Sequence, residues 1–151
     1  MNLEPQWIVG FVDGEGCFFV GINANATLTQ KKQVLPEFVV VQHKKDIAVL
    51  HALKNYFKCG VVRVNHGDRM CYRVRKHANF MQFILPFFEK HKLKTKKRID
   101  FEKFRDIILL MDKKKHLTVE GILEIDKIKN EMNTKRLQSS ITEPKIESSF
   151  D

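Results

Sequence analysis

Apolar residues recur along the chain with two alternating periods. Some stretches carry them every three to four residues, as one face of a helix does, and others alternate every two residues, as a half-buried strand does. The element order is therefore αββαββ followed by three further helices. We expect helices at 5–14, 46–57, 79–87, 95–111 and 118–132, and strands at 17–24, 34–42, 61–66 and 70–76.

Local signals mark the ends of several of these elements. The Gly-Glu-Gly sequence at 14–16 breaks the first helix. We expect Asp46, Thr95 and Thr118 to cap the helices that follow them, because short polar side chains accept the unpaired N–H groups of a first turn. Pro86 should distort the end of the third helix, since proline lacks a backbone N–H and crowds the preceding turn.

Two hairpins with a helix between them predict an α+β fold. The expected architecture is one curved, antiparallel, four-stranded sheet with helices packed on one face. We assign residues 1–136 to this domain. The segment 137–151 has no apolar period and carries one Lys against three acids, so we expect a disordered C-terminal tail.

The basic charge of the chain is unevenly distributed. The 151 residues include 27 Lys or Arg and 18 Asp or Glu, a net charge of +9. Residues 1–30 contain no Lys or Arg and three acids, so the rest of the chain has a net charge of +12. Such a basic body is typical of nucleic-acid binding, although a membrane surface, a ribosome or no polyanion at all fits the charge alone.

Other classes of protein fit the sequence poorly. No apolar run approaches the roughly 18 residues of a membrane span, and the N-terminus lacks the basic flank of a signal peptide. The three cysteines, Cys17, Cys59 and Cys71, have no zinc-site spacing and are odd in number. We therefore expect an intracellular protein in a reducing compartment, without a membrane partner.

Residues 8–16 combine small and acidic residues in one helix. Gly10 and Gly14 lie four residues apart, which allows close packing against another helix. Asp13 and Glu15 stand at the C-terminal end of this otherwise uncharged helix, where the helix dipole disfavours negative charge. The pattern fits simple helix packing, and it also fits a metal site at a shared helix end.

The sequence IVGFVDGEG at 8–16 resembles the LAGLIDADG motif of homing endonucleases, with Gly10, Asp13 and Gly16 retained. The resemblance continues over about residues 5–136 and implies the LAGLIDADG homing-endonuclease fold. Because only one motif is present, it also implies a homodimer whose motif helices pack at the twofold axis. The expected dimer-interface residues are Gly10, Phe11, Asp13 and Gly14.

The resemblance implies a metal-dependent nuclease centre near that axis. Glu15 and the carbonyl of Gly14 would bind Mg²⁺ or Mn²⁺, because these ions prefer oxygen ligands. The metal would activate water and stabilise the leaving 3′ oxygen. Asp13 would have a structural role at the helix junction.

Basic and amide side chains complete the expected centre. Gln42 falls on the family position that orients water, and a basic residue before the long helix supports the scissile phosphate. Lys94, Lys96 and Lys97 compete for this second role, and we expect Lys94 and Lys97 to take it. The basic run at 90–98 also fits a surface that faces solvent or phosphate.

Alternation divides the strand residues between two faces. We place Phe18, Val62, Val64 and Tyr72 toward the helices, and Cys71 on the opposite face. That opposite face has Arg, Asn and Gln side chains where a major-groove reader needs them, and a dimer could cover about 20 base pairs. The expected DNA-binding residues are Phe19, Asn23, Gln33, Glu37, Val39, Arg63, Asn65, Arg69, Arg73 and Arg75.

The resemblance therefore implies a site-specific homing endonuclease. It would hydrolyse both strands of a long pseudo-palindromic DNA site as a homodimer and leave 3′ overhangs. The alternatives are an RNA maturase with intron RNA as its partner, a non-cleaving nucleic-acid-binding protein, or a half-enzyme that needs a different second half. The expected location is a mitochondrion, a chloroplast or a prokaryotic cytoplasm.

Overall fold

The computed structural model describes residues 1–132. The expected tail at 137–151 and the last residues of the 1–136 domain lie outside the described residues. The main helices and strands, in chain order, are α1 (Pro5–Glu15), β1 (Gly16–Ala24), β2 (Lys32–His43), α2 (Ile47–Phe57), β3 (Val61–His66), β4 (Arg69–Val74), α3 (His77–Asn79), α4 (Leu85–Lys90), α5 (Lys97–Asp112) and α6 (Val119–Asn130).

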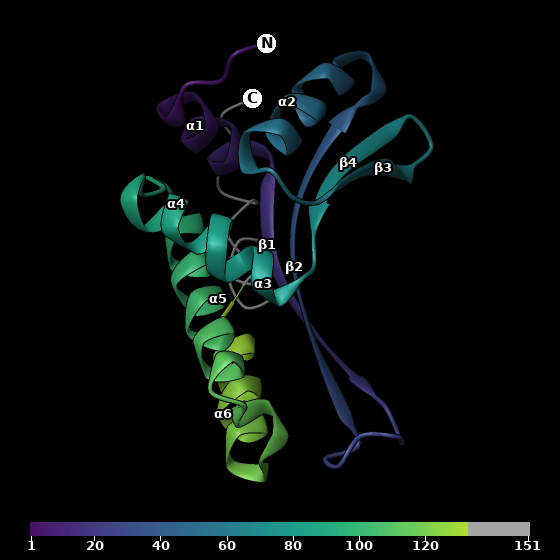
Figure 1. Cartoon of the computed structure of the whole chain (residues 1–151), viewed down its shortest axis with the longest axis vertical. Helices are drawn as coiled ribbons and strands as arrows, with labels where there is room; N and C mark the ends of the chain where they lie inside the picture. The colour runs from purple at the N-terminus through teal and green to yellow at the C-terminus, as the bar shows by residue number, and fades with distance from the viewer. Residues whose placement is uncertain (133–151) are drawn as a thin grey trace, which may run out of the picture.

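The four strands form one antiparallel sheet in the order β1-β2-β4-β3. The helices lie on one side of the sheet, and the long β1–β2 hairpin extends past β3 and β4 (Figure 1). The predicted α+β fold is therefore confirmed, including the antiparallel pairing of neighbouring strands. None of the helices within residues 1–132 is long and apolar enough to cross a membrane.

Aromatic side chains from the sheet and the helices build the core. Phe18 and Phe38 stack across β1 and β2 with ring centroids 4.9 Å apart. Phe88 of α4 and Phe104 of α5 pack against Phe18 at 5.6 and 5.3 Å. All four are fully buried, and removing one such side chain typically costs about 3–5 kcal/mol. Buried side chains of α1 belong to the same core, which therefore holds both α1 and α5 against the sheet.

One of the three expected helix caps is present. Thr118 Oγ1 accepts the Gly121 N–H at 3.0 Å, as predicted. The N-cap of α5 is Lys96, without a side-chain cap, and Thr95 lies one residue earlier, where its Oγ1 accepts the Lys97 N–H at 3.2 Å. The prediction for Asp46 is wrong, because its side chain makes no cap hydrogen bond. A 3₁₀ turn precedes α2, and His43 Nδ1 accepts the Lys45 N–H there instead.

The expected helix at 79–87 is interrupted. It begins earlier, at His77, and residues Phe80–Ile84 form a π-helical turn before α4. Pro86 lies in the first turn of α4. Its missing N–H and its ring prevent a regular α-helical path through the preceding turn, so the chain widens to the π pattern there.

Two strand residues differ from the alternation pattern. Val64 is 59% exposed although the alternation predicts that it faces the helices. It keeps the register of Val62 and pairs with Met70, and it lies near the end of the edge strand β3, just before a bulge. Cys71 is on the opposite face as predicted, yet it is buried. It pairs with Val41 on one side and with Arg63 on the other, so neighbouring side chains cover this small residue.

Candidate active site and nucleic-acid interface

The motif helix α1 turns directly into β1. Ile8, Val9 and Val12 are buried and fix one side of the helix against the sheet. Gly16 follows the last helical residue, and a Cβ there would come within 2.8 Å of the Val12 side chain. A glycine is therefore needed at this tight corner, which leaves Glu15 exposed at the end of the helix.

The opposite side of α1 is open. Gly10 and Gly14 are exposed, and a Cβ built at either would meet no atom of residues 1–132 within 4 Å beyond the local backbone of α1. Trp7 is 45% exposed, and its ring stacks on Phe11 at 4.9 Å. Packing among the described residues does not require glycine at residues 10 and 14. The face thus combines two glycines with an exposed aromatic pair, as a helix-packing surface does.

The carboxylate of Asp13 connects α1 to the segment before α5. Its Oδ2 accepts the Lys94 N–H at 2.9 Å. Its Oδ1 accepts the Thr95 hydroxyl at 2.7 Å and the Thr95 N–H at 3.3 Å. Asp13 thus has the geometry of the structural junction that the sequence predicted. The role of Thr95 in this junction was not anticipated, since sequence position identifies it only as a helix cap.

Lys97 reaches the C-terminal end of α1. Its Nζ donates to the carbonyl oxygens of Val12 and Asp13, each at 3.1 Å. Burial lowers the pKa of Lys97, and the nearby Cys17, Asp13 and Glu15 oppose this effect. The half-buried ammonium therefore lies beside the candidate catalytic acid.

Lys94 has a different position. It contacts Asp13 through its backbone N–H, and its side chain is exposed. The structure thus places the side chain of Lys97, rather than that of Lys94, in the network at the end of α1. Lys96 is also exposed and precedes the first residue of α5.

Gln42 lies on the strand next to the end of α1. Gly16 pairs with Val40, so Gln42 is two residues beyond the first residue of β1. The Gln42 Oε1 accepts the His43 N–H at 3.0 Å, and the side-chain nitrogen of Gln42 takes no part in that hydrogen bond. This position agrees with a role near Glu15, which stays a prediction.

The end of α1 offers some of the oxygen ligands that a hard cation prefers. The Glu15 carboxylate is exposed, and the adjacent helix end supplies backbone carbonyls at the negative end of the helix dipole. Such oxygens are typical Mg²⁺ ligands. Within residues 1–132, no three His, Cys, Asp or Glu side chains are grouped to hold a metal ion.

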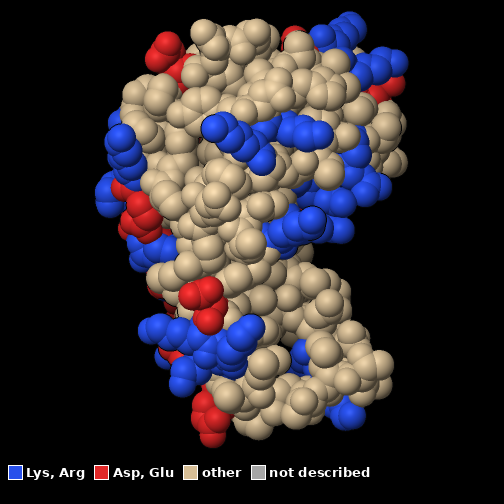
Figure 2. Space-filling model, viewed as in Figure 1, with Lys and Arg blue, Asp and Glu red and all other residues tan. Residues whose placement is uncertain are grey.

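The predicted DNA-binding residues share the sheet face away from the helices. Phe19 pairs with Glu37, Val39 with Arg73, and Asn23 with Gln33. Arg63 lies across from Cys71, and the exposed residues Asn65 and Arg69 flank the β3–β4 turn. These side chains therefore lie on one surface, which we call the groove face. It comprises the sheet centre, the β1–β2 hairpin and the β3–β4 hairpin. Figure 2 shows Lys and Arg side chains on the right of the molecule, above a marked hollow.

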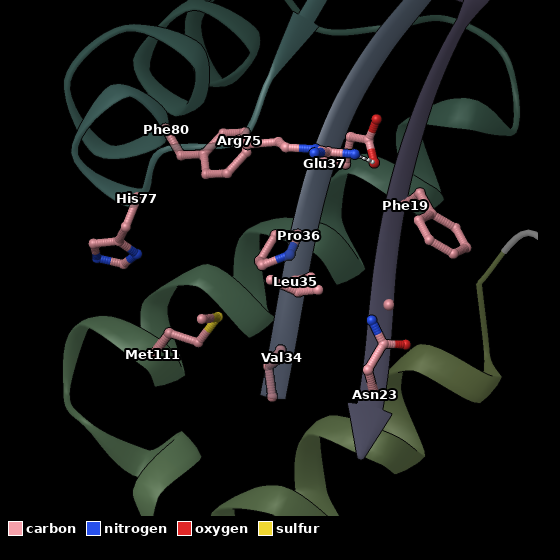
Figure 3. A pocket seen from close by; sticks show the side chains of 11 residues that line it. Phe19, Asn23, Val34, Leu35, Pro36, Glu37, Arg75, His77, Phe80 and Met111 are labelled. Carbon is pink, nitrogen blue, oxygen red and sulfur yellow. Dashed lines mark ion pairs between the residues drawn. The ribbon is translucent and has the colours of Figure 1, made fainter. Parts of the chain in front are cut away.

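A cavity of about 390 Å³ opens beside β2, where β4 has already ended. Figure 3 shows Phe19, Leu35, Glu37 and Arg75 around it, with Met111 contributed by α5. His77 also lines it, and its Nε2 lies 2.9 Å from Asp112 Oδ1. The sequence pattern did not predict this cavity, because it depends on how α3 and α5 pack beside the sheet edge.

Comparison with known proteins identifies the class to which this fold and site belong. Residues 8–108 match the LAGLIDADG endonuclease family. A probable intron-encoded endonuclease of Neurospora crassa is 30% identical over 128 residues, which cover 84% of this chain and 27% of that protein. The homing endonuclease I-ApeII of Aeropyrum pernix is 32% identical over 120 residues, which cover 78% of this chain and 70% of that protein.

Solved structures agree with this result. The homing endonuclease I-TnaI is 53% identical, with a TM-score of 0.86 and coverage of 95% of this chain and 99% of that one. The I-LtrWI LAGLIDADG homing endonuclease bound to target DNA is 34% identical, with a TM-score of 0.85 and coverage of 88% of this chain and 45% of that one. This chain belongs to the LAGLIDADG homing endonuclease family. It spans about a quarter of the length of the first curated relatives it matches.

Proposed function

We propose that the chain is a site-specific DNA endonuclease that acts as a homodimer. The observation that carries this proposal is the geometry at the end of α1. The exposed Glu15 lies beside Lys97 there, and the same helix presents an open face with Gly10 and Gly14. The relatives named above as endonucleases, and the neighbour bound to target DNA, support the same activity.

The dimer follows from the open face of α1. Two copies of this helix could approach closely at the glycines, because a Cβ built at either glycine has no packing neighbour within 4 Å among residues 1–132. The exposed Trp7–Phe11 pair would bury its apolar surface in the same contact. A twofold axis at this face would bring two copies of Glu15 together.

The chain's own groups then have distinct roles in phosphodiester hydrolysis. Glu15 and the Gly14 carbonyl would hold Mg²⁺ or Mn²⁺, which when bound supplies activated water and charge stabilisation at the departing 3′ oxygen. The Lys97 ammonium would stabilise the negative charge of the scissile phosphate. Gln42 would orient the attacking water. Lys94, with its exposed side chain, would contact the DNA backbone nearby.

The groove face supplies the binding surface. Its Arg, Asn and Gln side chains can donate to base edges and phosphates. Two copies would read the two halves of a long pseudo-palindromic site, and staggered cleavage of both strands would leave 3′ overhangs. We place the protein in an organelle or a prokaryotic cytoplasm, because relatives are named as intron-encoded proteins.

The experiment uses a duplex selected by the protein from a random-sequence DNA library in the presence of a chelator. Mg²⁺ or Mn²⁺ is then added, the product ends are sequenced, and the mass of the complex is measured by light scattering. We expect a dimer on one duplex and two staggered cuts with 3′ ends protruding. A monomeric complex, or a protein that binds structured RNA and leaves selected duplexes intact with either metal, would contradict the proposal.

A further inference from the structure

Glu37 is an acidic residue on a sheet face that carries several arginines. Within residues 1–132 it is the only acidic residue in the four strands, and it lies on the face that carries Arg63, Arg73 and Arg75. A carboxylate here repels the phosphates of any nucleic acid that approaches. Because Glu37 weakens the general attraction to DNA, we look for its contribution in the choice among DNA sequences.

The carboxylate is paired with Arg75. Glu37 Oε2 lies 3.5 Å from Arg75 Nη2, and the two side chains come from β2 and from the residue that follows β4 (Figure 3). The Glu37 side chain is 22% exposed and the Arg75 side chain 58%. The acid is therefore the inner member of the pair, and the guanidinium is the outer one.

This geometry changes what Arg75 can bind. A guanidinium has five N–H donors in a rigid fork, and the Glu37 contact engages one nitrogen. The pair is nearly neutral as a unit, so it suits a phosphate less well than a free arginine does. The remaining donors still match two acceptors side by side, which is the pattern that O6 and N7 of guanine present in the major groove.

We propose that Arg75 reads one guanine in each half of the DNA site and that Glu37 is the positioning residue that sets its orientation. This inference rests on the proposed function, because it takes double-stranded DNA as the ligand. It goes further by assigning one base and one pair of residues that determine specificity.

The strand geometry limits the effect to one base pair. Residues two apart on the same face of a strand are about 6.6 Å apart, which is about two base-pair steps. Leu35 and Val39, on either side of Glu37 along β2, therefore face different base pairs. In a twofold dimer, a change in the pair should alter two symmetry-related positions and leave the others as they were.

The test measures base preference by binding, without cleavage. Wild-type protein and variants select duplexes from a random library in a chelator, and the bound DNA is sequenced. We expect the wild type to select guanine at one position per half-site. Glu37→Gln, which keeps the shape and removes the charge, should lower that preference by about 5- to 100-fold. Arg75→Gln should abolish it, and adding Glu37→Gln to Arg75→Gln should change nothing more.

Two further variants separate this role from a structural one. Arg75→Lys keeps the charge and loses the fork, so it should bind DNA and select guanine poorly. Glu89→Gln breaks a similar pair with Arg105, 3.0 Å apart on the helical side, and should leave the selected sequence unchanged.

The two proposals fail in different ways. If the wild type selects a sequence and both Glu37→Gln and Arg75→Lys select the same one with equal preference, the inference is overturned and the proposed function stands. If both variants weaken preference at every position alike, Glu37 has only a structural role, which also overturns the inference. If the wild type enriches no duplex sequence, the proposed function fails and the inference fails with it.

Discussion

At the scale of single residues, one hydroxyl group links the motif helix to the helix that carries the basic residue. Thr95 Oγ1 donates to Asp13 and accepts from the Lys97 backbone. Lys97 in turn donates to the last carbonyls of α1. The position of the Lys97 ammonium beside Glu15 therefore depends on a short hydrogen-bonded network rather than on the lysine alone.

Replacing Thr95 tests that dependence. Thr95→Val keeps the shape but removes both hydrogen bonds, so cleavage should fall and the free energy of unfolding should drop by about 1 kcal/mol. Thr95→Ser retains the hydroxyl and should restore both. Single-turnover cleavage and denaturant unfolding measure the two effects. If Thr95→Val cleaves like the wild type, the network does not position Lys97.

The two candidate lysines should behave differently. Lys97→Met should lower the cleavage rate by about 10²- to 10³-fold, as the loss of one preorganised charge does at other active sites. Lys94→Met should affect DNA binding more than cleavage, because the Lys94 side chain is exposed. Equal losses of cleavage rate in both variants would contradict this assignment.

The same pair of variants gives a pH test. Burial lowers the pKa of Lys97, so its positive charge is lost at a lower pH than that of an ordinary lysine. Cleavage should therefore decline on the alkaline side as pH rises through the lowered pKa. The cleavage profile of Lys94→Met should keep this decline, and that of Lys97→Met should lose it.

At the scale of elements, sequence pattern and structure agree where local periodicity decides the outcome. The alternation around Phe18 and Phe38 correctly assigned the buried and exposed sides of β1 and β2. The local pattern did not predict conformations that depend on neighbouring residues and segments. A 3₁₀ turn capped by His43 replaced the Asp46 cap, and Pro86 imposed a π-helical turn whose geometry no apolar period encodes.

The open face of α1 permits an element-scale prediction. Gly10→Leu should leave the fold intact, because residue 10 is exposed and a Cβ built there has no packing neighbour within 4 Å among residues 1–132. It should prevent dimerisation, because the bulky side chain would hold two motif helices apart. Sedimentation measures the mass, and thermal unfolding serves as the control for the fold. A Gly10→Leu protein that stays dimeric would place the dimer contact elsewhere.

At the scale of the whole molecule, the uneven charge corresponds to a division of the surface. The first 30 residues, which have no Lys or Arg, form α1, β1 and the start of the loop after β1. The basic residues follow on the groove face, the β3–β4 hairpin and the segment before α5, and also on α2, α5 and α6. The sequence predicted the sheet and the buried and exposed sides of β1 and β2. It did not predict the Thr95 junction, the cavity beside β2 or the Glu37–Arg75 pair, because each requires contacts between distant segments.

The account places catalysis at Glu15 and binding on the separate groove face. The most direct measurement therefore compares Glu15→Gln with Glu120→Gln, an exposed glutamate of α6, for duplex affinity and for cleavage of the same selected DNA. We predict that Glu15→Gln binds with unchanged affinity and cleaves at least about 10³-fold more slowly, while Glu120→Gln matches the wild type in both. Cleavage by Glu15→Gln at the wild-type rate would contradict the account.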